Sequence, residues 1–176
     1  NLYLSLNCYD SLYIYDTSGQ HIYVDSILWT NRQMKFSSAG KKLQWVSSLP
    51  GRTDFLVTDL DVDIRGNTYL SVNFSYNHKD TAIFRAAGFS PPDTSLLSVG
   101  AVFVIDTSGQ AKNWYYLRST VTLSISNITV HDTNSVFIYG TIYGDSIVSG
   151  SYKLKMPNKG FYHFYARLDI NGNVDW

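Results

Sequence analysis

The chain has 176 residues, its 14 basic and 14 acidic side chains give a formal net charge of zero, and apolar residues make up 44% of it. This length is enough for a domain with a substantial core. The balanced charge argues against a nucleic-acid binder that relies on bulk electrostatics, and no apolar run approaches the roughly 18 residues of a membrane span.

The composition favours strands over helices. All 14 acidic residues are Asp, which prefers turns and caps, and Glu, which prefers helices, is absent from the sequence. Tyrosine is abundant, with 14 copies, and suits strands. The single Cys8 excludes an intrachain disulfide framework. We therefore expect an all-β protein.

One strand sequence recurs along the chain. Residues 1–7, NLYLSLN, match residues 67–73, NTYLSVN, at five of seven positions, and SVFIYGT at 135–141 is a third version. These predict strands over 2–8, 68–75 and 135–143. A further strand is expected before the second copy, over 57–65, and another before the third, over 123–132. A connection of roughly 25 residues follows each copy, with room for a short hairpin.

A second motif recurs after each connection, as an apolar-rich run, a turn that ends in glycine, and a tryptophan. It predicts hairpins over MKFSSAGKKLQW at 34–45, VFVIDTSGQAKNW at 102–114 and ARLDINGNVDW at 166–176. The glycines are Gly40, Gly109 and Gly172, and the tryptophans are Trp45, Trp114 and Trp176. Copies about 65 residues apart indicate an array of similar units.

Most of the turns share a local mechanism. They begin with Asp and have Gly three residues later, in the pairs Asp16–Gly19, Asp63–Gly66, Asp106–Gly109 and Asp169–Gly172. The Asp side chain can accept a hydrogen bond from the backbone N–H two residues on, and Gly tolerates a positive φ. Asn67 continues the second of these turns. Calcium binding by the Asp residues is the alternative, but the turn alone explains the pattern.

The predicted strands carry apolar residues on both faces. Residues 102–105 read Val-Phe-Val-Ile, and Phe161, Phe164 and Tyr165 also place bulk on both sides. A half-exposed strand would alternate, whereas small sheets stacked face to face, as in a β-propeller, are covered on both faces. The repeated tryptophans would fill equivalent gaps between such sheets.

The expected fold is a β-propeller-type repeat array of about three four-stranded units, over about 1–50, 51–117 and 118–176, within a single repeat region 1–176. The chain begins and ends inside a unit, so we expect it to be part of a longer protein. Closed propellers need at least about four blades, so further sequence or a second copy would complete the ring.

These motifs resemble a known family. VDIRGNTY at 62–69 is similar to the VDxxGNxY start of β-propeller repeats from secreted and surface bacterial proteins and from large viruses, and residues 138–176, ending FYARLDINGNVDW, resemble the rest of that unit. The likeness covers nearly the whole chain. Residues 37–40, SSAG, and 131–134, HDTN, depart from the Asp-x-x-Gly pattern, and 8–33 has room for an extra hairpin. The resemblance implies a scaffold and no particular activity.

Three carboxylates are candidates for chemistry. Asp59, Asp61 and Asp63 alternate along one predicted strand, so they share a face. They would line a hydrated central channel, or hold a Ca²⁺ ion, which prefers oxygen ligands. The matching positions in the next unit are Asn127, Thr129 and His131, which are polar but not acidic. This difference favours the channel wall, and we predict neither a metal site nor a cofactor.

Other signals are weaker. Lys153, Lys155 and Lys159 suit a solvated edge strand, with an anion or glycan contact as the alternative. Asn73 and Asn127 head N-glycosylation sequons, and the sequence leaves their occupancy open. We find no pattern of a zinc protease, an α/β-hydrolase or a phosphate loop, and we predict no catalytic residues.

The functional expectation is a non-enzymatic structural or protein-interaction module of a surface, secreted or virion protein. A protein partner or self-association is expected, and neither nucleic acid nor a membrane span. One alternative is a carbohydrate-binding propeller, which would expose Tyr or Trp at equivalent places in each unit. Another is a metal-dependent enzyme centred on the Asp59–Asp63 strand.

Overall fold

The structure is a computed structural model, and it describes residues 2–8, 12–15, 18, 20–25, 30–37, 43–49, 55–75, 98–132, 135–169 and 173–175. All regular structure in these residues is β-strand, which confirms the all-β prediction. The described residues up to 49 belong to one compact unit and those from 55 onward to another. In the described part of the chain, no helix is long and apolar enough to cross a membrane.

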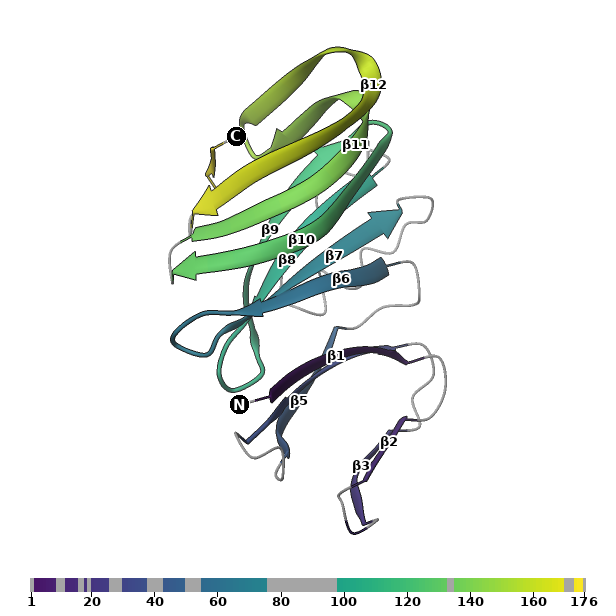
Figure 1. Cartoon of the computed structure of the whole chain (residues 1–176), viewed down its shortest axis with the longest axis vertical. Helices are drawn as coiled ribbons and strands as arrows, with labels where there is room; N and C mark the ends of the chain where they lie inside the picture. The colour runs from purple at the N-terminus through teal and green to yellow at the C-terminus, as the bar shows by residue number, and fades with distance from the viewer. Residues whose placement is uncertain are drawn as a thin grey trace. The chain divides into compact units, whose positions relative to one another are not determined.

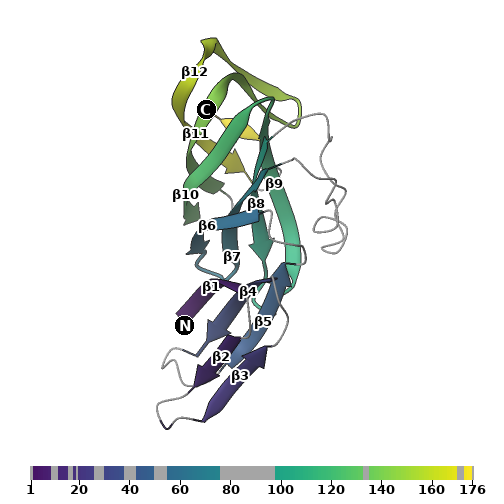
Figure 2. The same ribbon diagram turned by 90° about the vertical axis from the view of Figure 1, so that its right-hand side faces the viewer.

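The first unit contains two antiparallel sheets (Figure 2). Three strands, β1 (Leu2–Cys8), β4 (Thr30–Phe36) and β5 (Leu43–Leu49), pair in the order β1-β4-β5. The hairpin of β2 (Leu12–Tyr15) and β3 (His21–Asp25) is separate. The strand predicted over 2–8, the hairpin predicted over 34–45 and the extra hairpin within 8–33 are therefore confirmed.

The second unit begins with a four-stranded antiparallel meander, which we call the first meander (Figure 1). Its strands are β6 (Phe55–Val62), β7 (Thr68–Ser75), β8 (Ser98–Ile105) and β9 (Ala111–Ser119). Every residue of β8 is buried. The prediction that 102–105 are covered on both faces is therefore confirmed.

The second meander follows at once, with strands β10 (Thr122–Asp132), β11 (Ser135–Ser149), β12 (Tyr152–Asp169) and β13 (Val174–Asp175). The connection predicted after the third copy contains a hairpin, for which the sequence left room, because β11 and β12 continue their pairing to Ser149 and Tyr152. A turn with Gly150 at φ 55° joins them. The register shifts beyond the Gly144–Gly160 pair, so residues 156–159 bulge out of the ladder.

The two meanders have the same register in their first three strands. Asp61 pairs with Tyr69 and Tyr69 with Val104 in the first. In the second, Thr129 pairs with Phe137 and Phe137 with Arg167, at the corresponding places relative to the turns. Even the bulge recurs, between residues 57 and 59 in β6 and between 125 and 127 in β10. The repeat in the sequence is therefore a repeat in strand pairing.

The two meanders belong to one sheet, because β11 also pairs with β9 at Val148 and Arg118, and this sheet curls. As a result β10, whose ladder is with β11, lies over the strands β6, β7 and β8 (Figure 1). The core lies between the two meanders. Its buried apolar side chains include Val102, Val104, Leu117, Ile125, Ile138 and Phe164.

Two glycines permit this close packing. A Cβ on Gly100 would lie 2.8 Å from side-chain atoms of Ile125 and of Leu123, both on β10. A Cβ on Gly140 would collide with the backbone oxygen of Ser124 and lie 2.5 Å from the ring of Phe164. The absence of a side chain lets β10 pack closely on β8 at Gly100 and lie beside its ladder partner β11 at Gly140.

Candidate functional site

The Asp turns hold their backbone through the carboxylate. Asp63 Oδ1 accepts hydrogen bonds from the N–H groups of Arg65 (2.8 Å) and Asn67 (2.9 Å), and Oδ2 accepts one from the Asn67 side-chain amide (2.8 Å). The Gly66 N–H donates to the Asp63 carbonyl oxygen, and Gly66 has φ 84°. These carboxylate oxygens are therefore occupied within the turn.

The Asp residues that follow β8 and β12 accept similar hydrogen bonds. Asp106 Oδ1 accepts from the N–H groups of Ser108 and Gln110, and Gly109 has φ 88°. The Ser108 hydroxyl donates to the same oxygen (2.6 Å), and this bond lowers the pKa of Asp106. Asp169 accepts from the backbone N–H and the side-chain amide of Asn173.

Some of the predicted turn and tryptophan residues are not among those that the structure describes. Asp16, Gly19, Gly40, Gly172 and Trp176 lie outside the described residues.

The two described tryptophans, Trp45 and Trp114, lie against aromatic neighbours. Trp114 stacks between Phe103 (6.2 Å between ring centres) and Tyr116 (4.8 Å). Trp45 meets Tyr3 edge to face at 6.5 Å, and its Nε1 has no hydrogen-bond acceptor among the described residues.

Asp59 and Asp61 connect the two meanders. Asp59 Oδ2 accepts a hydrogen bond from the backbone N–H of Ile128 (2.8 Å), and Asp61 Oδ2 accepts one from Val130 (2.7 Å). Their Oδ1 atoms accept from the N–H groups of the residues that follow them, Leu60 and Val62. Bonds from backbone N–H to a carboxylate are charge-assisted and strong. The predicted channel-wall residues therefore anchor β10 to β6.

Asn73 extends this contact in an unusual way. Its side-chain oxygen accepts from the Ile125 N–H (2.7 Å), while its nitrogen donates to the Ile125 carbonyl oxygen (2.8 Å) and to Ser124 Oγ (2.9 Å). The amide thus pairs with both backbone groups of one residue, as a neighbouring strand would. A glycan on this nitrogen would replace one of its two hydrogens, so the nitrogen could no longer donate both bonds. The other sequon residue, Asn127, is exposed.

No group of three or more His, Cys, Asp or Glu residues that could hold a metal ion occurs within the described residues. The carboxylate oxygens of the candidate calcium ligands accept hydrogen bonds from N–H groups instead. These residues are Asp59, Asp61 and Asp63. The sequence could not reveal this use, because Ile128 and Val130 lie 69 residues further along the chain than their acceptors.

The outer face of the second meander, away from the core, is aromatic and exposed. Phe137 on β11 is 45% exposed, and Phe161 and Tyr165 on β12 are 63% and 73% exposed. The prediction that Phe161 and Tyr165 are buried in a stack was therefore wrong for this chain, although Phe164, on the opposite face, is buried. Exposed apolar patches of this kind mark contact surfaces.

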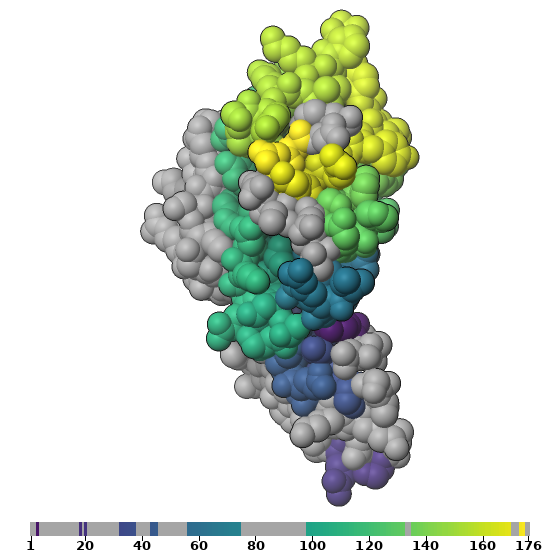
Figure 3. Space-filling view, turned by 90° about the vertical axis from the view of Figure 1, so that its left-hand side faces the viewer, coloured from purple at the N-terminus to yellow at the C-terminus, as the bar shows by residue number. Residues whose placement is uncertain are grey.

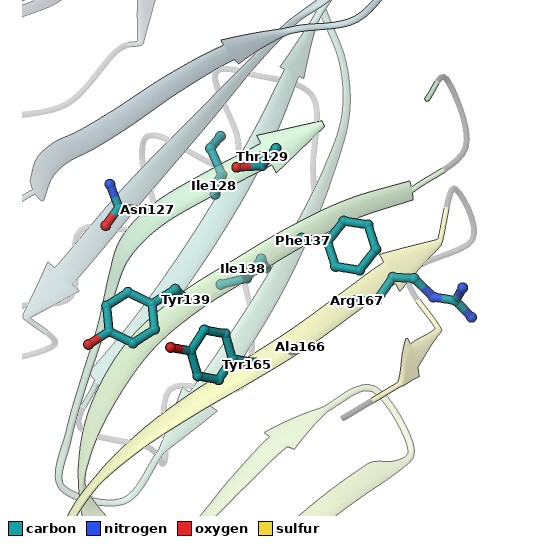
Figure 4. Close-up of a pocket in the computed structure, with 9 residues that line it drawn as sticks. All are labelled: Asn127, Ile128, Thr129, Phe137, Ile138, Tyr139, Tyr165, Ala166 and Arg167. Atoms are coloured by element: carbon teal, nitrogen blue, oxygen red, sulfur yellow. The ribbon is translucent and has the colours of Figure 1, made fainter. Parts of the chain in front are cut away.

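A hollow of about 430 Å³ lies on this outer face. Figure 4 shows the rings of Tyr139 and Tyr165 side by side, with Phe137 and Arg167 further along the same strands. The Tyr139 and Tyr165 ring centres are 5.1 Å apart, and the Tyr139 hydroxyl is hydrogen-bonded to His163 Nδ1 at 2.7 Å. Asn127 lies beside them on β10. The lining offers stacking surfaces with a few polar groups.

A second hollow, of about 440 Å³, lies at the bulge in β12. Figure 3 shows the end of the β11–β12 hairpin in yellow-green. The predicted lysines Lys153, Lys155 and Lys159 line it and are exposed, and Asp145 also lines it. The Lys159 ammonium lies 5.7 Å from the ring centre of Tyr143. The structure therefore places the lysines on a solvated hairpin, as the edge-strand interpretation expects.

Burial affects two tyrosines on the core side of the first meander. It raises the pKa of Tyr69 to about 12, with the negative charge and hydrogen bond of Asp63 acting in the same direction. Burial also raises the pKa of Tyr115, against the effect of a hydrogen bond from Asn113. Both hydroxyls are thus held neutral, which is typical of packing residues rather than of acids or bases that work near neutral pH.

Comparisons with known proteins add no assignment. No protein-family model matches the sequence, and no curated protein matches it significantly.

Proposed function

We propose that this chain is a non-enzymatic structural or protein-interaction module of a secreted, cell-surface or virion protein, built as an incomplete β-propeller with about three four-stranded units. The setting rests on the sequence resemblance. The observation that supports the architecture most strongly is the pair of meanders with one register and one bulge, packed face to face. In a propeller each blade is a four-stranded antiparallel sheet, and neighbouring blades stack face to face.

The use of the carboxylates supports a structural role. Asp59 and Asp61 on β6 would be the most natural catalytic or metal-binding groups of a central channel, but they bond to backbone N–H groups of β10. A carboxylate whose two oxygens each accept a backbone N–H has fewer free lone pairs to offer a metal ion. The metal-dependent enzyme is therefore the weaker alternative.

The carbohydrate-binding alternative has one observation in its favour, the exposed ring of Tyr165 beside the half-buried ring of Tyr139. It expects exposed aromatic residues at equivalent places in each unit. The residue at the place of Tyr165 in the first meander is Val102, four residues before the Asp of the turn, and it is buried. This difference gives the sugar-binding alternative less support than the interaction module has.

Electron microscopy of the protein purified from its native source tests the architecture, with its intact mass measured on the same sample. We expect a ring of blades around a central channel, and a particle without a ring would refute the propeller.

The metal alternative is tested by thermal unfolding with 1 mM Ca²⁺ or with a chelator. For the native chain we expect the same unfolding midpoint with Ca²⁺ as with the chelator, and we expect the same of Asp59→Asn. A Ca²⁺-dependent rise that Asp59→Asn removes would instead support the metal-dependent alternative.

A further inference from the structure

The strand register shows which parts of the two meanders are equivalent. Tyr69 and Ser71 lie two and four residues after Asn67, and Phe137 and Tyr139 lie two and four residues after Ser135. The cross-strand partners correspond as well, since Ser71 pairs with Val102 and Tyr139 pairs with Tyr165. The outer face of the second meander is therefore the same face that the first meander turns towards β10.

These equivalent faces differ in one respect, which is whether another unit covers them. In the first meander Tyr69 is 6% exposed and Val102 is fully buried, because the second meander lies over them. Their counterparts Phe137 and Tyr165 are 45% and 73% exposed. A repeat unit is thus seated on the first face, and the second face has the same strand register, with aromatic side chains at the corresponding places.

The polar groups correspond too. Asp59 and Asp61 accept N–H bonds from the covering strand β10. Asn127 and Thr129 occupy their positions in the second meander, opposite Tyr139 and Phe137 in the ladder, and both are exposed. An amide oxygen and a hydroxyl can accept the same kind of hydrogen bond. The outer face thus presents acceptors beside an apolar surface, as the covered face does.

We propose that this outer face docks the N-terminal sheet, β1-β4-β5, of a second copy of the chain. The proposal rests on the proposed repeat architecture and names the surface and its partner. The sequence of β1 matches that of β7 at five of seven positions, and the order β1-β4-β5 corresponds to β7-β8-β9. The N-terminal sheet therefore corresponds to the last three strands of a unit of the same repeat. Two copies related by a two-fold axis would form this contact twice and close.

The first test is sedimentation of the 176-residue chain over a range of concentrations. We expect a dimer, and a dissociation constant raised about 100-fold or more in the double variant Phe137→Ser/Tyr165→Ser, because buried aromatic anchors dominate interfaces. Both residues are exposed, so the variant should keep its circular dichroism spectrum and melting midpoint at low concentration. Ile64→Ser is the control, since Ile64 is 91% exposed on a turn outside this face.

The second test identifies the occupant. A photo-crosslinking amino acid at position 165, in a mixture of isotopically light and heavy chains, should give light–heavy crosslinks to residues 2–8 or 30–49. Crosslinks between two outer faces, or only within one chain, would overturn the stated partner. A monomer at all concentrations would overturn the docking. A monomer whose Tyr165 signals shift with oligosaccharide would assign the face to a glycan instead.

These outcomes are separable from those of the proposed function. A ring formed by the native protein, together with a 176-residue chain that stays monomeric, would retain the propeller and overturn the second-copy docking. A dimer that depends on Phe137 and Tyr165, formed by a protein that shows no ring, would retain the second-copy docking and overturn the propeller.

Discussion

The bond between Asp59 and the N–H of Ile128 offers a direct test of how the meanders are joined. Asp59→Ala removes the acceptor 2.8 Å from a backbone donor whose own side chain is buried. A hydrogen bond to a charged group contributes about 1.5–3 kcal/mol. Loss of the repulsion between Asp59 and Asp61 offsets part of this, by about 0.5 kcal/mol. We expect a net decrease of about 2 kcal/mol in the free energy of unfolding.

The assay is urea denaturation followed by circular dichroism, with thermal unfolding as a second measure. A loss of about 2 kcal/mol corresponds to a fall of about 4–8 °C in the melting midpoint for a chain of this length. Asn127→Ala is the matched control, because Asn127 has the same register position on the uncovered face. Measured at low protein concentration, it should change stability by less than about 0.5 kcal/mol. Equal effects of the two substitutions would refute the reasoning.

Three further predictions concern single residues. Gly140→Ala should destabilise the fold by about 1–3 kcal/mol through overpacking, whereas Gly150→Asn, at a positive φ in open space, should be tolerated; equal urea midpoints would contradict this. Since the pKa of Tyr69 is raised to about 12 from 10.0, its contribution is fully present below pH 10 and is lost as the pH rises through 12. The free energy of unfolding should therefore fall by up to roughly 3 kcal/mol over that range, and Tyr69→Phe should remove this part of the pH dependence. Gly66→Ala should cost about 1–2 kcal/mol, because φ is 84° there, and an unchanged melting midpoint would contradict the assigned turn.

Local patterns in the sequence were sufficient to predict the strands and hairpins of both meanders. Alternation and Asp-x-x-Gly turns are determined over a few residues, so β7 was predicted with its observed bounds, 68–75. The connection after the third copy was expected to have room for a short hairpin, and β11 and β12 extend into one. Gly144 and Gly160 pair across the ladder, and Pro157 lies in the bulge, where its missing N–H is harmless.

The candidate site depended on contacts that local patterns do not contain. The sequence predicted that Asp59 and Asp61 share a face, but not that β10 supplies the donors, because that contact requires the sheet to curl. It also predicted burial for Tyr165, since large apolar side chains on both faces of a strand are typical of stacked sheets. Burial depends on the next unit as well as on the residue itself, and Tyr165 is exposed here.

The carboxylate contacts between β6 and β10 have a consequence for how this chain can diverge. Asp59 and Asp61 bond to main-chain N–H groups, which every residue except proline possesses. Substitutions at Ile128 or Val130 therefore leave the donors in place, whatever they do to the core. Unit-to-unit recognition of this kind tolerates sequence drift in the strand that is bound. A gene encoding such an array could duplicate or exchange whole units, and each junction would still form while the side chains around it changed.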